Sequence, residues 1–218
     1  MAESNSAVTL DHLAIVAPTL EEGAAHVREQ IGLDMQGGGE HPEMGTHNLL
    51  LRLGDDVFLE VIAVDPVAAK PAGPRWFGLA DEAAVRTTWN NGRRLRGFVA
   101  RTGDLDGILA GHSELLGRRT PVSRGDRRWF FSVRPDGLLP ADGAVPPVID
   151  WGSRGCPAPD MPDLGARLVG YEIEHPDPAW LEDLYAQLKF ANPPIVRRGA
   201  EIRLRAMIHT PGGVRELC

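Results

Sequence analysis

The sequence contains very little cysteine, and this scarcity excludes two classes of small protein. Among its 218 residues there are only Cys156, in a proline-rich stretch, and Cys218 at the last position. Two thiols placed this way provide neither a disulfide framework nor a zinc knuckle. The composition therefore favours a reducing compartment, and we expect a cytoplasmic protein.

Long apolar runs and runs of like charge are also missing. No stretch approaches the roughly eighteen apolar residues that a membrane-spanning helix needs, and Met1 to Val8 has neither the basic nor the apolar region of a secretory signal. The net charge is −7. Arginines gather only locally, at 93–96 and 124–128, without interleaved stacking aromatics. We interpret them as a solvated face and predict no nucleic-acid or membrane partner.

Three segments share one pattern, in which an apolar strand, a capping residue and an amphipathic helix follow one another. The strands and their caps are 10–18 with Thr19, 95–102 with Asp104, and 168–174 with Asp177. Glu22 completes a capping box with Thr19. Further strand candidates follow each helix, so the chain is expected to be an α+β protein built from repeated β-α-β-β units, with one more short strand in each.

Two stretches rich in proline and glycine, at 65–94 and 138–164, lie outside the repeat. Loops of this length inside a compact domain form lids or binding walls, but a surface connector with anchored aromatics explains them equally well. The first stretch contains Arg75-Trp76-Phe77, two large rings beside a cation, which favours a pocket wall. We therefore expect a loop or lid over residues 67–94.

Four ordered motifs give the chain a resemblance to a known family. They are LDHLAIVAP at 10–18, GGEHPEMGTHN at 38–48, FLEVIAVDP at 58–66 and RWFG at 75–78. In these motifs the chain resembles glyoxalase-like domain proteins of the vicinal-oxygen-chelate superfamily, which also includes bleomycin-resistance proteins and dioxygenases. The resemblance implies repeated βαβββ modules that form a cupped mixed sheet with the helices outside.

With this resemblance the chain divides into a first module at 8–66, the loop or lid at 67–94, and a second module at 95–152 that pairs with the first. A third, partial or accessory βαββ module follows at 165–218. The superfamily works with pairs of modules, so the third either covers the cup or pairs with its counterpart in a second subunit. We expect a homodimer.

The resemblance also implies a set of metal ligands, taken position by position. His12 stands at the ligand site of the first strand and Glu60 at that of the fourth. In the second module an alignment places Leu95 opposite His12 and Asp150 opposite Glu60, so one ligand is missing. His12, Glu60 and Asp150 would hold a divalent ion such as Zn, Mn, Ni or Fe and leave positions open for water or substrate. Without a metal, His12 is a partly buried histidine hydrogen-bonded to Glu60, and both interpretations stay open.

Candidates for substrate binding come from the second motif and from the loop. His41 and His47 flank the turn that leads into a strand, and Asn48 occupies the position that the resemblance marks most strongly. His47 and Asn48 point to opposite faces of that strand, and the sequence does not tell which face is concave. Arg75 and Trp76 of the loop complete the set.

Two functions from different classes follow. The first is a divalent-metal-dependent lyase or isomerase of glyoxalase type acting on a small carbonyl-containing metabolite, with Glu60 or Asp150 as the base. A ring-cleaving dioxygenase needs two histidines and a carboxylate, and Leu95 at the second histidine position disfavours it. The alternative is a non-catalytic protein of the bleomycin-resistance type that binds or sequesters a small molecule, in which Trp76, Phe77, Trp89 and Trp129 matter more than His12.

Overall fold

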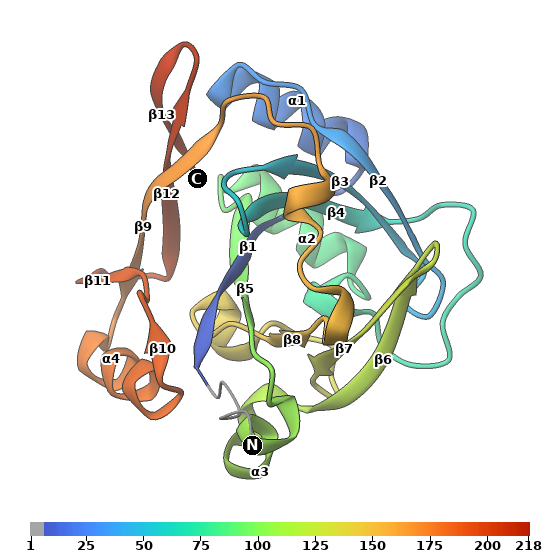
Figure 1. The fold of residues 1–218 in the computed structure, drawn as a ribbon, viewed down its shortest axis with the longest axis vertical. Helices are drawn as coiled ribbons and strands as arrows, with labels where there is room; N and C mark the ends of the chain where they lie inside the picture. Colours follow the sequence, from blue (N-terminus) through green and yellow to red (C-terminus); the bar gives the residue numbers. More distant parts are fainter. Residues whose placement is uncertain (1–6) are drawn as a thin grey trace.

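A curled sheet of mixed strands forms the body of the protein (Figure 1). The computed structural model describes residues 7–218. The strands of this main sheet are β1 (Val8–Val16), β2 (Gln36–His41), β3 (Thr46–Arg52), β4 (Phe58–Val64), β5 (Leu95–Arg101), β6 (Arg118–Arg124), β7 (Arg127–Val133), β8 (Val148–Asp150) and β10 (Phe190–Ala191). They lie in the order β2-β3-β4-β1-β5-β8-β7-β6, with β10 beside β1. This half-barrel sheet confirms the predicted α+β fold class.

The two halves of the main sheet meet at β1 and β5. β1 is parallel to β4 and β5 is parallel to β8, whereas β1 and β5 are antiparallel to each other. The first and fourth strands of each half are thus neighbours. Side chains on β1 and β4 therefore share one face wherever their positions correspond.

Within residues 7–218 four α-helices accompany the sheets: α1 (Leu20–Ile31), α2 (Glu82–Asn90), α3 (Leu105–Leu116) and α4 (Pro178–Gln187). The side chain of Thr19 caps α1 by accepting a hydrogen bond from the backbone N of Glu22 at 3.2 Å. The reciprocal half of the predicted capping box is not made, because the Glu22 carboxylate binds Arg86 of α2 instead. Among the described residues no helix is both long and apolar enough to cross a membrane.

The helix α2 lies inside the stretch that the sequence suggested as loop. The carboxylate of Asp81 caps it by accepting from the backbone N of Ala84 at 2.9 Å. Trp89 is its one buried residue, so its sequence carries little of the apolar periodicity that reveals a helix. Short 3₁₀ turns, at 76–78, 140–143, 152–154 and 158–160, shape the remaining connections.

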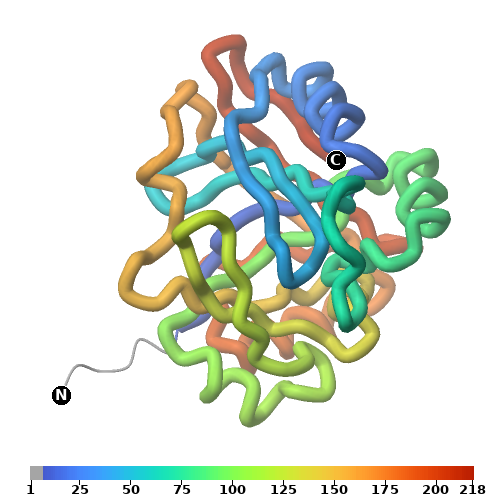
Figure 2. Tube along the Cα trace, turned by 90° about the vertical axis from the view of Figure 1, so that its right-hand side faces the viewer, coloured from blue at the N-terminus to red at the C-terminus, as the bar shows by residue number. Residues whose placement is uncertain are grey.

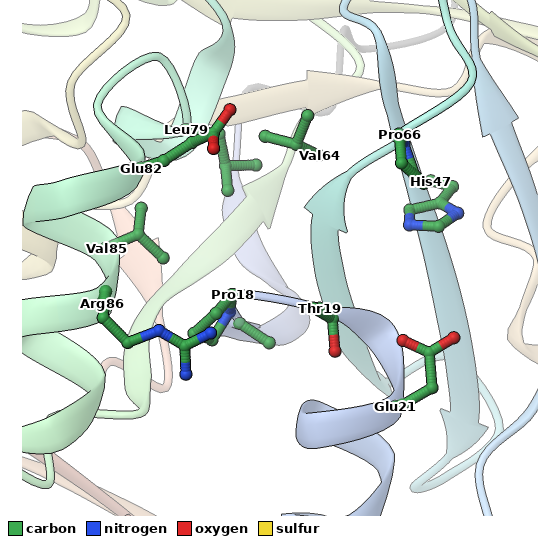
Figure 3. A pocket seen from close by; sticks show the side chains of 11 residues that line it. Pro18, Thr19, Glu21, His47, Val64, Pro66, Leu79, Glu82, Val85 and Arg86 are labelled. Carbon is green, nitrogen blue, oxygen red and sulfur yellow. The ribbon is translucent and has the colours of Figure 1, made fainter.

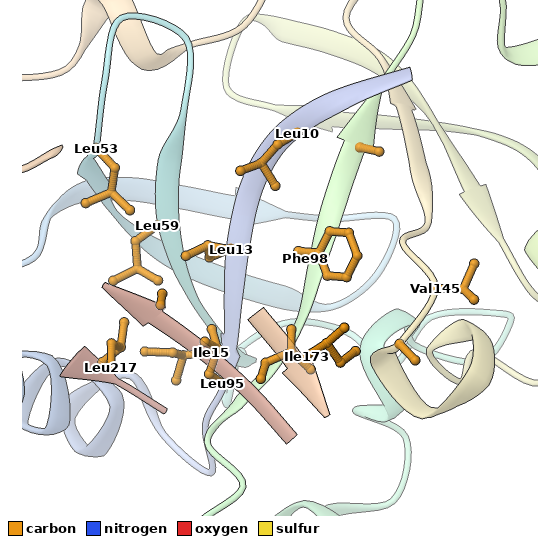
Figure 4. Packing of buried hydrophobic residues seen from close by; sticks show 14 of the residues in the cluster. Leu10, Leu13, Ile15, Leu53, Leu59, Leu95, Phe98, Val145, Ile173 and Leu217 are labelled. Carbon is orange, nitrogen blue, oxygen red and sulfur yellow. The ribbon is translucent and has the colours of Figure 1, made fainter. Parts of the chain in front are cut away.

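A second, smaller sheet packs against the outer face of the main sheet. Its strands β9 (Arg167–His175), β11 (Ile195–Arg198), β12 (Arg203–Thr210) and β13 (Gly213–Leu217) lie in the order β11-β9-β12-β13. Ile173 and Leu217 of this sheet share one apolar core with Leu13, Ile15 and Phe98 of β1 and β5 (Figure 4). The sequence left two positions open for the third module, over the cup or against a second subunit. The segment from β9 to β13 lies on the outer face and therefore does not cover the concave face.

The inner, concave face of the main sheet has a core of its own. Because side chains alternate along a strand, Ala14 and Val16 of β1 point away from the outer core. They join Phe58 and Ile62 of β4 and Val99 of β5 in a second apolar cluster that is rich in aromatic rings. This inner face carries the polar residues of the sequence motifs.

Candidate functional site

The inner face encloses a small cavity, which we call the aromatic chamber. Six phenylalanine and tryptophan rings line it: Phe58, Trp76, Phe77, Trp129, Phe131 and Trp151. Its polar lining consists of His12, His41, Asn48, Glu60 and Arg124. The cavity volume of about 20 Å³ leaves room for about one water molecule.

His12 and Glu60 form the polar centre of the aromatic chamber. In the parallel pair β1–β4, His12 lies opposite Phe58 and Ala14 opposite Glu60, so both polar side chains point inward. The Nε2 atom of His12 lies 3.4 Å from Oε2 of Glu60. The imidazole stacks on the ring of Phe58 with 4.5 Å between centroids, and both polar residues are buried. The two groups thus lie side by side, as the motif positions predicted.

The carboxylate of Asp11 contacts Nδ1, the other ring nitrogen of His12. Its Oδ1 lies 2.6 Å from His12 Nδ1, and its Oδ2 accepts a hydrogen bond from the indole N–H of Trp151 at 2.8 Å. Asp11 is completely buried. Sequence reasoning missed it because neighbouring residues of a regular strand point to opposite faces. A register shift between Leu10 and His12 breaks that alternation, as a β-bulge does.

Asn48 and His41 extend the network on the Glu60 side. The amide Nδ2 of Asn48 donates to Oε1 of Glu60 at 2.6 Å, while its Oδ1 accepts from the backbone N of Gly39 at 3.0 Å. His41 lies beside the amide, with its Nε2 at 3.4 Å from Asn48 Nδ2 and its Nδ1 at 3.1 Å from the hydroxyl of Thr46. Both oxygens of Glu60 are therefore engaged, one with Asn48 and one with His12.

Opposing influences set the pKa values in the network. Burial alone would lower the pKa of His12, but the hydrogen bonds and charges of Asp11 and Glu60 raise it to about 9. Burial alone would raise the pKa of Glu60, but the hydrogen bond and charge of His12 lower it to about 2. Burial lowers the pKa of His41 to about 4. At neutral pH the site thus holds an imidazolium–carboxylate pair beside a neutral imidazole.

The other predicted substrate-binding residues divide between two places. Trp76 lines the aromatic chamber and donates from Nε1 to Thr46 Oγ1 at 3.1 Å. Arg75 lies outside the chamber lining and donates to the backbone oxygen of Gly45 at 3.3 Å. His47 points the opposite way from Asn48 and lines a separate pocket of about 320 Å³ between the ends of α1 and α2 (Figure 3). The structure thus groups His41, Asn48 and Trp76 with His12 and Glu60, and separates His47 and Arg75 from them.

Asp150, expected as a metal ligand and as a base, lies outside the aromatic chamber. β8 presents its neighbour Ile149, together with Trp151, to the chamber. Asp150 itself accepts a hydrogen bond from the backbone N of Gly152 at 2.9 Å. The alignment that placed Asp150 opposite Glu60 was displaced by one residue, and a displacement of one residue exchanges the two faces of a strand.

On β5 the expected position also lies outside the inner face. Leu95, which the alignment placed opposite His12, lies in the outer core, as does Trp89, one of the rings expected in a binding pocket. Val99 pairs with His12 across the sheet and belongs to the inner cluster. The second half of the sheet therefore contributes the apolar side chains of Val99, Ile149 and Trp151 to that cluster.

The side chains of the chamber do not fit the divalent ion that the resemblance implied. Across residues 7–218 no three His, Cys, Asp or Glu side chains lie close enough together to hold a metal ion. Both ring nitrogens of His12 are already engaged by carboxylates, Nδ1 by Asp11 and Nε2 by Glu60.

Comparisons with known proteins agree with the fold. The model of a family described as "Glyoxalase-like domain" matches residues 10–189. A substituted methylmalonyl-CoA epimerase from Streptomyces coelicolor, solved with 2-nitronate-propionyl-CoA, is 18% identical over 66% of this chain and 94% of its own, with a TM-score of 0.40. The methylmalonyl-CoA epimerase from Mycobacterium tuberculosis is 18% identical over 71% and 94%, with a TM-score of 0.42.

A hypothetical protein from Bacillus halodurans C-125 is also similar in structure. It is 14% identical over 67% of this chain and 96% of its own, with a TM-score of 0.42. A search among curated proteins returned no match.

Proposed function

Because the chain belongs to the glyoxalase-like domain family of the vicinal-oxygen-chelate superfamily, we propose that it is a lyase or isomerase acting on a small carbonyl-containing metabolite. The observation that carries the proposal is the buried pair of His12 and Glu60, 3.4 Å apart on neighbouring parallel strands. An acid and a base this close can act on the two adjacent atoms of a carbonyl and its α-carbon. The proposed reaction uses no protein-bound divalent metal, because Asp150, the third expected ligand, lies outside the aromatic chamber.

In the proposed reaction Glu60 takes the proton from the α-carbon while His12 gives its Nε2 proton to the carbonyl oxygen. The electrons of the broken C–H bond form the C=C bond of an enol or enediol. For an α-hydroxy carbonyl compound the intermediate is an enediol. Glu60 then gives its proton to the former carbonyl carbon while the hydroxyl on the other carbon gives its proton to His12 Nε2, which completes an isomerisation. Asp11 keeps the His12 ring oriented throughout, because it holds Nδ1 at 2.6 Å.

The low pKa of Glu60 sets a condition on this chemistry. A carboxylate with a pKa of about 2 is a weak base. When the substrate oxygen draws the proton away from His12, the charge that holds the Glu60 pKa down is lost. Glu60 thus becomes a stronger base as the C–H bond breaks, and the two transfers support one another.

A metabolite of this kind does not fit the closed chamber of about 20 Å³, so the proposal includes an opening step. Residues 67–94 are the proposed lid, because Trp76 and Phe77 of this segment line the chamber. Phe77 adopts a left-handed backbone conformation, with φ of 56°. For a bulky residue that conformation costs about 1–3 kcal/mol, a strain often found in segments that move.

Exchange of carbon-bound hydrogen in D₂O tests the proposal. Pyruvate, pyruvamide and dihydroxyacetone are incubated with the protein, and loss of the α-proton signal is followed by proton NMR. The native protein is expected to accelerate exchange of at least one compound, and Glu60→Gln to slow it by about 100-fold or more. Glu114→Gln, an exposed change on α3, is the matched control and should leave the rate unchanged. The proposal fails if the native protein exchanges no compound faster than buffer, or if Glu60→Gln retains the native rate.

A second candidate is a non-catalytic protein that sequesters a small molecule, as bleomycin-resistance proteins do. It is favoured by the six rings that line the aromatic chamber, since such rings bind flat apolar ligands without chemistry. Under this alternative His12→Gln would preserve ligand binding, and the ligand would be recovered unchanged. Under the first proposal a bound carbonyl compound would exchange its α-proton.

Three broader features complete the proposal. We propose that residues 8–66 and 95–152 act as paired modules with 165–218 as an accessory module, and that the protein works in the cytoplasm, where its two free cysteines stay reduced. We also propose a homodimer through the small sheet, which exposes the apolar residues Val169, Ile195 and Val214. Light scattering at micromolar concentration tests this last point, and a monomeric mass would contradict it.

A further inference from the structure

Trp129 brings an unused hydrogen-bond donor to the wall of the aromatic chamber. Its side chain is almost fully buried, with 5% exposed, and its ring lies 5.0 Å from that of Trp151 and 5.9 Å from that of His41. Within residues 7–218 its indole Nε1 has no hydrogen-bond partner. A buried donor without an acceptor destabilises a protein by about 1–3 kcal/mol. Such a group therefore points to an acceptor that arrives with a ligand.

Arg124, at the end of β6, brings an uncommitted positive charge to the same chamber. Its one hydrogen bond in the described part of the chain is a long one of 3.4 Å to Oδ1 of Asn48, and no carboxylate lies within salt-bridge distance. Arg127, three residues later, is by contrast fixed by Asp160 and the backbone oxygen of Gly155, each at 2.6 Å. The charge of Glu60 is already met by His12. Burial lowers the pKa of Arg124, and the charge of Glu60 opposes this shift.

The position of Arg124 connects the chamber with solvent. Arg124 lines the aromatic chamber and also a surface hollow of about 640 Å³ between the hairpins β2–β3 and β6–β7, which lie side by side in Figure 2. Glu43 and Ser123 join these hairpins through a hydrogen bond of 2.6 Å. A side chain at Gly39 would place its Cβ 2.8 Å from Cγ of Arg124. The glycine thus leaves room for the arginine to lie across the boundary.

We propose that Arg124 and the indole N–H of Trp129 bind a carboxylate of the substrate, so that the ligand is a small 2-oxo acid and not a neutral carbonyl compound. When the proposed lid at 67–94 opens, the carboxylate meets the guanidinium at the boundary with the surface hollow, and the adjacent carbonyl lies toward His12 and Glu60. A carboxylate accepts bonds from both donors at once, and charge-assisted bonds from arginine are among the strongest available. The assignment of the carbonyl end rests on the proposed function, whereas the carboxylate site rests on the two unused donors.

Isothermal titration calorimetry with pyruvate and pyruvamide tests this assignment. The two compounds have nearly the same shape and differ in charge. The native protein is expected to bind pyruvate at least about tenfold more tightly than pyruvamide. Arg124→Gln should remove this preference and Trp129→Phe should reduce it, whereas Arg128→Gln, an exposed change in the same hairpin, should preserve it. Circular dichroism checks that each variant is folded.

The inference is overturned if the native protein does not bind pyruvate more tightly than pyruvamide, including the case in which neither binds. It is also overturned if Arg124→Gln and Arg128→Gln alter the preference equally. The D₂O exchange experiment separates this inference from the proposed function. A preference for pyruvate without proton exchange supports the carboxylate site and defeats the enzyme. Exchange of pyruvamide without any preference supports the enzyme and defeats the carboxylate site.

Discussion

Raising the pH from 6.5 to 9 is expected to destabilise the folded protein through a single group, His12. The pKa of this imidazole is about 9 in the folded protein, against 6.5 for the free side chain. A pKa raised on folding contributes stability that is fully present below the unfolded value and is lost as the pH rises through the folded value. The window of loss therefore runs from 6.5 to about 9.

The expected loss follows from this shift. A full shift from 6.5 to about 9 corresponds to about 3 kcal/mol, at 1.36 kcal/mol for each pKa unit. Part of it remains at pH 9, where half of the folded molecules still carry the proton. The free energy of unfolding should thus fall by about 2 to 3 kcal/mol over this range. The thiol of Cys156, whose pKa burial raises to about 12, adds to the loss only above pH 9.

Urea denaturation followed by tryptophan fluorescence at several pH values between 6.5 and 9 measures this effect. His12→Gln should be less stable than the native protein at pH 6.5 and should lose the pH dependence. His209→Gln, at an exposed position of β12, is the control and should behave as the native protein does. A native stability that is flat across this range, or an equal slope in His12→Gln, would refute the reasoning.

Three further substitutions test the supports of the site and of the fold. Asn48→Ala removes a 2.6 Å hydrogen bond to buried Glu60 and should lower the free energy of unfolding by about 1–3 kcal/mol; a urea midpoint equal to the native one would contradict this. Gly117→Ala forces a Cβ to within 2.2 Å of the backbone oxygen of Val133 at a φ of +87° and should cost about 2 kcal/mol or more. Gly111→Ala, where a Cβ meets open space within α3, should instead stabilise by about 0.5–1 kcal/mol. Equal melting temperatures for the two glycine variants would defeat the steric argument.

The repeated pattern of strand, cap and helix was predictable because it is local. Thr19, Asp104 and Asp177 each cap the helix that follows, as expected. The side-by-side arrangement of His12 and Glu60 was predictable for a different reason, namely the family motifs. Periodicity alone gives no information about which strands become neighbours.

For the second half of the sheet, the prediction from sequence placed β8 in a register displaced by one residue. β8 is three residues long and too short to reveal its face by alternation, so a displacement of one residue exchanged Asp150 for its chamber-facing neighbours. Asp11 was missed because a strand irregularity, and not alternation, aims it at His12. Neither feature leaves a signal in a single sequence.

The arginines show a third limit. A solvated face was the simplest interpretation of both clusters, yet Arg96 binds Asp142 at 2.7 Å and Arg127 is buried. Their partners lie tens of residues away in the chain, so only tertiary contacts distinguish a structural arginine from a free one. Arg124 is distinguished in the same way, because no carboxylate of the described residues lies within salt-bridge distance of its guanidinium.

The protonation state of His12 is the most direct test of the account, because a buried ion pair and a metal ligand require opposite states. Proton–nitrogen NMR of histidine-labelled protein at pH 7, recorded before and after one equivalent of Zn²⁺, measures it. We expect both ring nitrogens of His12 to carry a proton, bonded to Asp11 and Glu60, and their shifts to be unaffected by zinc. A neutral His12 ring whose signals move in proportion to added zinc would contradict the account and restore a metal centre.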